Sequence, residues 1–188
     1  GAEGAVDHVF LQDGKVQYHV IGDKAPLGLC GSGLLDLVAV LLETGDLDET
    51  GHLEGGDYRL CDNVTLTQKD VREVQLAKAA IRAGIELMAQ HLGTEVDSIQ
   101  KVLLAGAFGN YLDPVSACKI GMIPPVLEKK IQPIGNAAGA GAKLCALCTE
   151  EFAYATRLAA ETEFLELAAL PEFQDQYVDC LTFEEDGI

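Results

Sequence analysis

The chain has 188 residues, of which 13 are basic and 30 acidic, so its formal net charge is −17 at pH 7. This balance argues against nucleic acid as the main partner, because phosphate binding needs a basic footprint, and against an anionic membrane surface. No apolar run reaches the roughly 18 residues that a membrane span requires. With 48% apolar residues, the composition is that of a folded domain rather than a disordered chain.

Six cysteines are spread through the chain, at positions 30, 61, 118, 145, 148 and 180. They are too sparse for a disulfide scaffold of this size, and we therefore expect reduced thiols and a cytoplasmic protein. The sequence begins with Gly1-Ala2-Glu3 and has no initial methionine, so we expect a piece of a longer protein. Its length suits a single domain over residues 1–188.

The first elements expected are a hairpin and a buried helix. Residues 5–21 alternate loosely between apolar and polar around the turn at Asp13-Gly14, which predicts a β-hairpin. The apolar run 34–42 follows a glycine-rich turn and predicts a helix, with Ser32 as its N-cap and Gly45 as its stop. Because apolar residues cover most of its faces, this helix should be buried.

The longest helix is expected after an acidic loop over residues 43–66. Thr67 and Asp70 have the spacing of a capping box, and the helix should end near Leu92. Apolar residues then follow at three- and four-residue spacing, at Val71, Val74, Ile81, Ile85 and Met88. Lys78 interrupts this apolar stripe, so it is a candidate ligand contact, with a charged solvent-facing helix surface as the alternative.

Two strand–turn–helix units come next. The apolar run 102–105 predicts a buried parallel strand, followed by the turn 106–110 and a short helix with Pro114 in its first turn. A second strand at 131–134 leads through Gly135-Asn136 into a helix that starts with small residues. Glycine after a strand lets a ligand approach the backbone, and amides at a helix start favour anions or nucleotides.

Neither turn is specific by itself. The segment 103–110 lacks both the G-x-G-x-x-G spacing and the Lys-Ser/Thr of a phosphate-binding loop, so a structural tight turn is the alternative. In segment 134–142 the small residues permit close packing of two backbones, and the alternative is a hinge or the lining of a nucleotide cleft. The chain should end with a helix at 150–160, a strand at 164–167 and a helix from Pro171.

Cysteine and histidine offer little support for catalysis. Cys145 and Cys148 form a C-x-x-C within a predicted helix, but no second pair supplies the four ligands of zinc. Buried thiols are one interpretation, and an iron–sulfur cluster that bridges two subunits is another. The four histidines form no Ser/His/Asp or H-E-x-x-H grouping. We therefore predict no catalytic residue and no metal site within the chain.

Four segments in this order closely resemble the C-terminal domain of reductive activators of corrinoid proteins. They are residues 29–36, 66–81, 104–114 and 135–142, and the resemblance covers residues 3–183. It implies an α/β fold, a ribonuclease-H-like lobe of the actin, sugar kinase and heat-shock chaperone ATPase superfamily, with a mixed sheet and flanking helices. Residues 67–93 would be a helical insert in that lobe.

The resemblance also implies an activity for the parent protein. Members of this family carry a [2Fe-2S] cluster in an N-terminal ferredoxin-like domain, followed by a middle region. They use ATP with Mg²⁺ to help drive reduction of Co(II) corrinoid to Co(I). The acceptor is the corrinoid protein of a methyltransferase or demethylase system, and a homodimer is also expected.

The family pattern suggests which residues of this chain would contact the nucleotide. The adenosine-contacting motif would be the turn 106–110, a connecting helix at the hinge would begin at 135–139, and the long helix would border the adenine. The predicted contacts are Gly106, Ala107, Phe108, Gly109, Asn110, Gly135, Asn136, Gly139, Gln75 and Lys78.

The chain departs from the family pattern in two respects. It contains no Asp-x-Gly-Thr phosphate-binding turn and no cysteine pattern for a [2Fe-2S] cluster. We therefore expect the latter half of the ATPase domain, with half a nucleotide site and no activity of its own. One alternative is a non-catalytic module whose acidic surface docks a corrinoid protein. The other is an activator of the acyl-CoA dehydratase type, with Cys145 and Cys148, or Cys30, holding a bridging [4Fe-4S] cluster.

Overall fold

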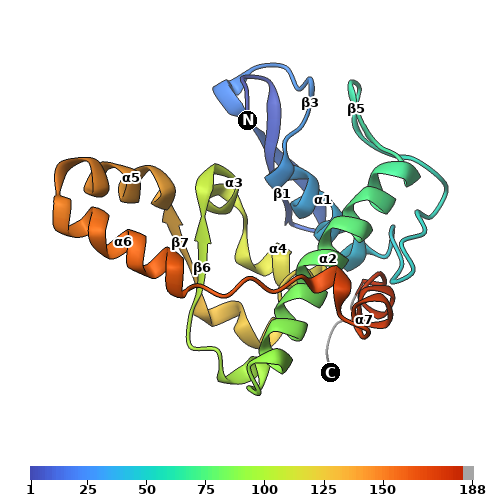
Figure 1. Ribbon diagram of the computed structural model, residues 1–188. Helices are drawn as coiled ribbons and strands as arrows, with labels where there is room; N and C mark the ends of the chain where they lie inside the picture. The colour runs from blue at the N-terminus through green and yellow to red at the C-terminus, as the bar shows by residue number, and fades with distance from the viewer. Residues whose placement is uncertain (184–188) are drawn as a thin grey trace.

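The computed structural model describes residues 1–183, apart from the side chain of Ala107 (Figure 1). Its strands form three small sheets, with the orders β2-β1-β3, β4-β5 and β6-β7. The first sheet is mixed, because β1 pairs antiparallel with β2 and parallel with β3. Helices flank the strands, which confirms the predicted α/β class, although the strands are divided among separate sheets.

The N-terminal hairpin is formed as predicted. Strand β1 (Ala5–Gln12) turns at Asp13-Gly14 into β2 (Lys15–Val20), and a short helical turn, η1 (Ile21–Asp23), leads to β3 (Gly28–Leu29). The pairing register shifts between Val6 and His8, so Asp7 occupies a bulge in β1. A bulge re-aims a side chain locally, and this one lies at the edge of the candidate site.

Helix α1 (Gly31–Thr44) packs on β1 and is largely buried, as its apolar faces predict. The prediction that Ser32 is the N-cap is wrong, since Cys30 holds that position. The Ser32 hydroxyl instead donates to the Asp7 carbonyl at 2.8 Å, because α1 approaches the β1 backbone closely. A Cβ on Gly33 would overlap the Val6 carbonyl oxygen. The predicted stop at Gly45 is confirmed.

Helix α2 (Gln68–His91) follows a short hairpin of β4 (Tyr58–Cys61) and β5 (Val64–Leu66). Its capping box is confirmed, with Asp70 Oδ2 accepting from the Thr67 amide at 2.9 Å. The predicted apolar stripe is wrong in its second half, where Ile81 and Met88 are exposed. The buried face instead includes residues at a steady spacing of four, namely Val71, Gln75, Ala79, Ala83 and Leu87. Such a row winds slowly around the helix. It lies beneath the C-terminal part of the chain, which crosses α2.

The second half of the chain contains the parallel pair β6 (Val102–Ala105) and β7 (Ile131–Gly135). Between them lie α3 (Gly106–Tyr111), α4 (Pro114–Lys119) and the short helical segment η3 (Pro125–Lys130), and η2 (Val96–Ser98) precedes β6. The prediction that β6 is buried is wrong. Its residues alternate between half-buried and exposed, because only one face of this two-stranded sheet is covered.

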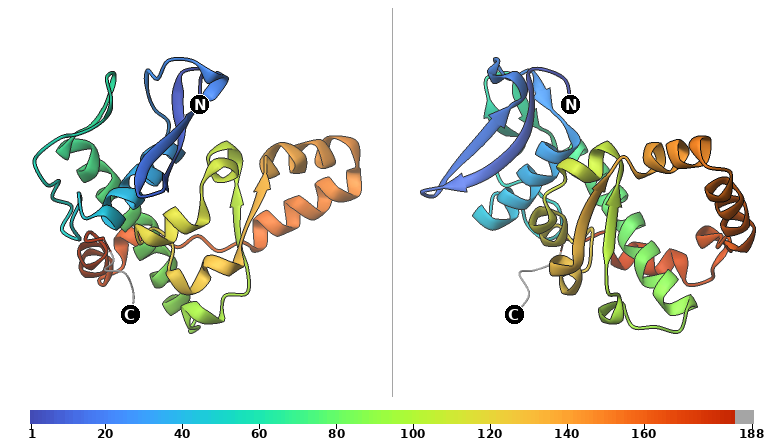
Figure 2. Two further views of the ribbon diagram at one scale, coloured as in Figure 1. Left: turned by 180° about the vertical axis from the view of Figure 1, so that it is seen from behind. Right: turned by 90° about the vertical axis from the view of Figure 1, so that its left-hand side faces the viewer.

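Helices α5 (Ala137–Leu147) and α6 (Thr149–Glu161) form a hairpin that extends from the end of β7 (Figure 2). Neither helix contains a buried residue. The strand predicted at 164–167 is wrong, since no described strand pairs with this segment. It runs across α2 to η4 (Leu167–Ala169) and α7 (Phe173–Asp179), and α7 packs against α2.

The main core lies between β1, α1, the first turns of α2 and α4. Leu37, Val38 and Leu41 of α1 are among its fully buried members. The core therefore holds the hairpin, α1 and α4 together, and α3 connects to this body through α4.

Among the described residues, no helix is both long and apolar enough to cross a membrane.

Candidate functional site

The two glycine turns predicted from the sequence lie at the same edge of a sheet. Gly106 follows β6 as the first residue of α3, so the segment predicted as a turn over 106–110 is helical. Gly135 is the last residue of β7, and both glycines have left-handed backbones with φ of +88° and +65°. Each leads directly into a helix, α3 or α5. Because β6 and β7 are parallel neighbours, their carboxyl ends form one rim, which is where ligands bind in open α/β sheets.

Helix α3 packs closely against this rim. A Cβ on Gly109 would lie 3.0 Å from Leu104 Cβ, so glycine allows α3 to fold back on β6. The side-chain oxygen of Asn110 lies 4.0 Å from the place that a Cβ on Gly135 would take. The structure therefore brings together Asn110 of α3 and Gly135 of β7, which are 25 positions apart.

Asn136 and Gly139 shape the start of α5. The Asn136 side-chain oxygen accepts a hydrogen bond from the Gly139 amide at 2.9 Å, which makes Asn136 the N-cap. A Cβ on Gly139 would lie only 2.6 Å from Asn136 Nδ2, so this cap requires glycine three residues later. Both residues thus have a local structural role, and their contact with a nucleotide stays a prediction.

Phe108 links the rim to α1. Its ring lies over Gly31, where an added Cβ would come within 2.6 Å of Cε2. A cleft of about 440 Å³ opens beside this contact, and its volume is in the range of small-ligand pockets. We call it the α3 cleft; it is lined by Gly1, Asp7, His19, Ile21, Gly22, Cys30, Gly31, Ser32, Phe108 and Tyr111.

The polar groups of the α3 cleft come from the hairpin and from the start of α1. His19 Nδ1 donates to Asp7 Oδ1 at 2.6 Å. This hydrogen bond and the negative charge of Asp7 raise the pKa of His19 above its ordinary value. On the floor, Cys30 Sγ lies 3.2 Å from Ser32 Oγ. The cleft therefore combines an aromatic wall, glycine backbone and one titratable pair.

Sequence reasoning missed Asp7, His19 and Tyr111 as members of this cleft. Asp7 and His19 are 12 positions apart on paired strands, and their contact depends on the strand register. Tyr111 directly follows the turn 106–110 and could have been included with it. The glycine-rich segment 30–33 was part of the family resemblance but was not assigned to a site.

Gln75 and Lys78 lie elsewhere, on the buried face of α2. Gln75 Nε2 donates to the carbonyl oxygens of Thr50 at 2.9 Å and Leu181 at 3.1 Å. Lys78 Nζ donates to the Thr182 carbonyl and lies 5.4 Å from the ring centroid of Phe183. The structure does not bring these two side chains to the α3 cleft, and their role at a nucleotide stays a prediction.

The cysteine pair ends α5. The Cys148 thiol donates to Glu150 Oε2 at 3.1 Å, and the Cys145 thiol lies 3.9 Å from the Glu151 carbonyl oxygen. In the part of the chain that the structure describes, no three His, Cys, Asp or Glu side chains gather as metal ligands.

Known proteins resemble this chain over most of its length. The corrinoid activation enzyme RamQ of Eubacterium limosum is 35% identical over 95% of the chain, which covers 35% of RamQ. A reductase of the Co(II) methylated amine-specific corrinoid protein from Methanosarcina barkeri is 29% identical over 58% of the chain and 20% of its own length.

A solved structure, a reductive activator for a corrinoid iron–sulfur protein, has a TM-score of 0.85 at 29% identity. The match covers 97% of this chain and 33% of that one, so the chain spans about a third of the activator's length. The model of one protein family, described as the C-terminal domain of RACo, the ASKHA domain, matches residues 1–188. The chain therefore belongs to the family of RACo C-terminal ASKHA domains.

Proposed function

We propose that this chain supplies half of the nucleotide site in an ATP-dependent reductive activator that returns Co(II) corrinoid proteins to Co(I). The observation that carries the proposal is that α3, which begins where β6 ends at the β6–β7 rim, supplies Phe108 and Tyr111 to the α3 cleft. Of the predicted nucleotide contacts that the structure describes, Phe108 is the one that lines this cleft. The relatives support it, since all three are named for an action on corrinoid proteins. Residues 1–188 would then be the latter half of the ATPase domain, with 67–93 as a helical insert.

The residues of the α3 cleft suit a nucleotide. Phe108 and Tyr111 are exposed aromatic side chains, whose faces can stack on a base. Gly22 also lines the cleft and carries no side chain, so ribose or phosphate oxygens can approach its backbone closely. Bound ATP would supply the free energy that drives the electron transfer, and these residues bind and orient it.

Other parts of the parent protein complete this proposal. Mg²⁺ would be held together with the phosphates by residues outside this chain, and the electron would come from a [2Fe-2S] cluster in another domain. We also propose a cytoplasmic protein, supported by six free cysteines, which suit a reducing compartment. A homodimer is part of the same proposal, and sedimentation equilibrium of the full-length protein tests it.

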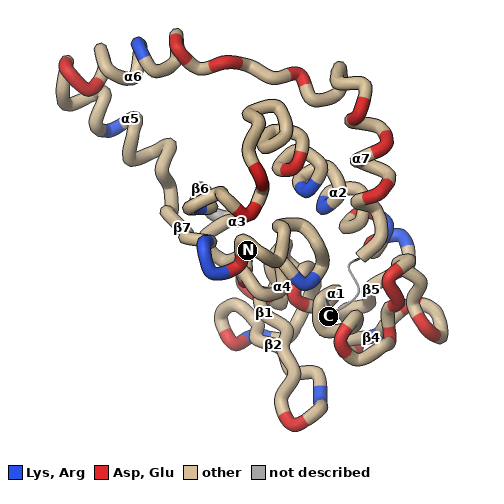
Figure 3. Tube along the Cα trace, turned by 90° about the horizontal axis from the view of Figure 1, so that it is seen from below, with Lys and Arg blue, Asp and Glu red and all other residues tan. Residues whose placement is uncertain are grey.

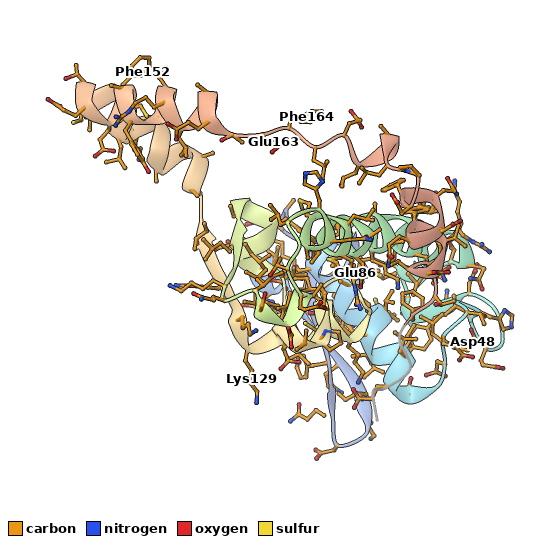
Figure 4. All side chains as sticks on the ribbon, turned by 60° about the horizontal axis from the view of Figure 1, so that its bottom comes forward. Asp48, Glu86, Lys129, Phe152, Glu163 and Phe164 are labelled. Carbon is orange, nitrogen blue, oxygen red and sulfur yellow. The ribbon has the colours of Figure 1, made fainter. Side chains whose placement is uncertain are left out.

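A binding measurement on the 188-residue chain tests the half-site directly. We expect calorimetric titration with ADP or a non-hydrolysable ATP analogue to show binding at one site, without ATP turnover. Phe108→Ala should weaken binding about tenfold, the order of one base–aromatic stack. Phe164→Ala is the matched control, because Phe164 is also exposed but lies on the segment between α6 and α7 (Figure 4). Turnover by this chain at the rate of the parent would contradict the half-site.

The activity is tested on the full-length protein with its corrinoid partner. Reduction of Co(II) to Co(I), followed by absorbance under anaerobic conditions, should require ATP. Phe108→Ala should slow it in proportion to the loss of nucleotide affinity, whereas Phe152→Ala, at another exposed phenylalanine in α6, should not change the rate. Reduction at the same rate without ATP would reject the nucleotide part of the proposal.

An acidic segment supports docking of a basic partner as a second role. Between residues 158 and 183 the chain has six acidic residues and no basic one. All six are exposed along α6, the connecting segment and α7 (Figure 3), namely Glu161, Glu163, Glu166, Glu172, Asp175 and Asp179. Phe164, 82% exposed, lies among them. We expect affinity for the corrinoid protein to fall with salt, and to fall further for Glu163→Lys than for Glu95→Lys, a control at an exposed position elsewhere.

A further inference from the structure

The Asp7–His19 pair is the polar feature of the α3 cleft that the predicted nucleotide residues do not include. Asp7 comes from the bulge of β1, and His19 comes from β2, where it pairs with His8. Both line the α3 cleft together with Phe108 and Tyr111. Their hydrogen bond joins His19 Nδ1 to Asp7 Oδ1 at 2.6 Å. The wall formed by the hairpin therefore carries a side chain that can gain or lose a proton.

The hydrogen bond to Asp7 fixes what His19 can offer a ligand. Because Nδ1 donates to a carboxylate, Nε2 is the ring nitrogen left to face other groups. The His19 side chain is 53% exposed, while that of Asp7 is only 14% exposed. A ligand in the cleft can thus reach the imidazole more readily than the carboxylate that orients it.

The charges around His19 decide which protonation state suits an anionic ligand. Asp7 from β1 and Asp23 from η1 both act on His19 with negative charge. Cys30 and Ser32 at the start of α1 and Tyr111 from α3 line the same cleft. The nearby Lys24 is paired with Glu3. Of the described side chains that line the cleft, His19 is the one that can become positive, and Gly1, which carries the terminal amino group, lines the cleft as well.

We propose that His19, oriented by Asp7, binds an oxygen of the nucleotide in the α3 cleft as an imidazolium, so that nucleotide affinity depends on the protonation of His19. This inference rests on the proposed nucleotide site. With His19 neutral, the negative charges of Asp7 and Asp23 oppose an anionic ligand beside it. With His19 protonated, one of these charges is compensated and Nε2 becomes a donor. The raised pKa of His19 keeps a larger share of the imidazolium at neutral pH.

The test compares ADP binding to the 188-residue chain between pH 5.5 and 8.5. We expect the wild type to bind more weakly as pH rises through the pKa of His19. His19→Asn should weaken binding about tenfold at low pH, the order of one charge-assisted hydrogen bond, and by little at high pH. Asp7→Asn should move the pH midpoint downwards, because it removes the group that raises the pKa of His19.

A second histidine–aspartate pair provides the matched control. His8 Nδ1 donates to Asp36 Oδ2 at 3.0 Å, from the same strand as Asp7 but outside the α3 cleft. His8→Asn should bind ADP with the profile of the wild type. The terminal phosphate of ADP itself titrates near pH 6, so the difference between variant and wild type is the readout. His19→Gln serves as a second substitution should His19→Asn fold poorly.

The outcomes separate the two proposals. If the wild type binds ADP and the His19 variants have its affinity and its pH profile, the role of His19 is wrong and the nucleotide site stands. If the wild type binds no nucleotide at any pH, the proposed half-site fails and the role of His19 fails with it. A tenfold loss confined to low pH, absent in His8→Asn, supports both.

Discussion

The ring of Phe108 lies directly over the backbone of Gly31, at the place where a side chain on residue 31 would begin. This contact joins two segments 77 positions apart, the turn after β6 and the first residue of α1. It fixes the aromatic wall of the α3 cleft relative to its floor. The contact therefore gives a way to disturb the cleft without touching a polar group.

Gly31→Ala should displace the Phe108 ring, because the new Cβ would lie 2.6 Å from Cε2. We expect nucleotide affinity to fall several-fold with only a small change in the free energy of unfolding, since Phe108 is about half exposed. Gly28→Ala is the control, as an added Cβ there meets nothing within 4 Å. Calorimetric titration measures the affinity, and equal affinities for both variants would contradict the role of this contact.

Gly51→Ala should destabilise the fold through Gln75. Gly51 has φ of +86°, and a Cβ there would lie 2.6 Å from the Gln75 amide group. Displacing that group also breaks its hydrogen bonds to Thr50 and Leu181. Gly55→Ala has a similar φ of +77° and open space around it, so it measures the backbone strain alone. Urea titration should show a loss larger by about 1–3 kcal/mol for Gly51→Ala.

Lys78→Met should loosen the end of the chain. Lys78 is 1% exposed, and its ammonium group donates to the Thr182 carbonyl beside the Phe183 ring. Methionine keeps most of the side-chain volume but cannot donate, so we expect a loss of about 1–3 kcal/mol in the free energy of unfolding. Lys69→Met on the exposed face of the same helix is the control. Similar urea midpoints for the two variants would show that this buried ammonium group adds little.

The Asp7–His19 pair should stabilise the fold at low pH and contribute less as pH rises. Asp7 raises the pKa of His19 in the folded chain above the ordinary value of 6.5. The stabilisation is then fully present below pH 6.5 and is lost as pH rises through the folded-state pKa. Asp7→Asn should therefore lower the free energy of unfolding more at pH 5.5 than at pH 8.5. NMR titration of His19 gives the folded pKa, and a value at or below 6.5 would contradict this account.

Features determined by neighbouring residues were predictable from the sequence. The hairpin turn at Asp13-Gly14, the capping box of Thr67 and Asp70, and the stop at Gly45 each depend on a few adjacent positions. The two glycine turns could also be placed at one rim, because successive parallel strands end at the same edge. Their role in ligand binding needed the family resemblance in addition.

Features that depend on tertiary contacts were not predictable. The Ser32 hydroxyl could have capped α1, but β1 passes close enough for it to donate to Asp7 instead. The apolar residues of α2 fit a stripe through Ile81, yet the segment that crosses α2 selects a different row. The α3 cleft combines residues of the hairpin, α1 and α3, whose approach depends on the bulge and on the packing of Phe108.

The helical hairpin of α5 and α6 has a consequence for folding cooperativity. Because none of its residues is buried, it can open without exposing the core around α1. Its amide protons should then exchange through local openings that denaturant hardly affects, whereas those of α1 should exchange only through global unfolding. The chain would thus consist of two cooperative units that join at Gly135, and the helical hairpin can unfold and refold while the α3 cleft stays intact.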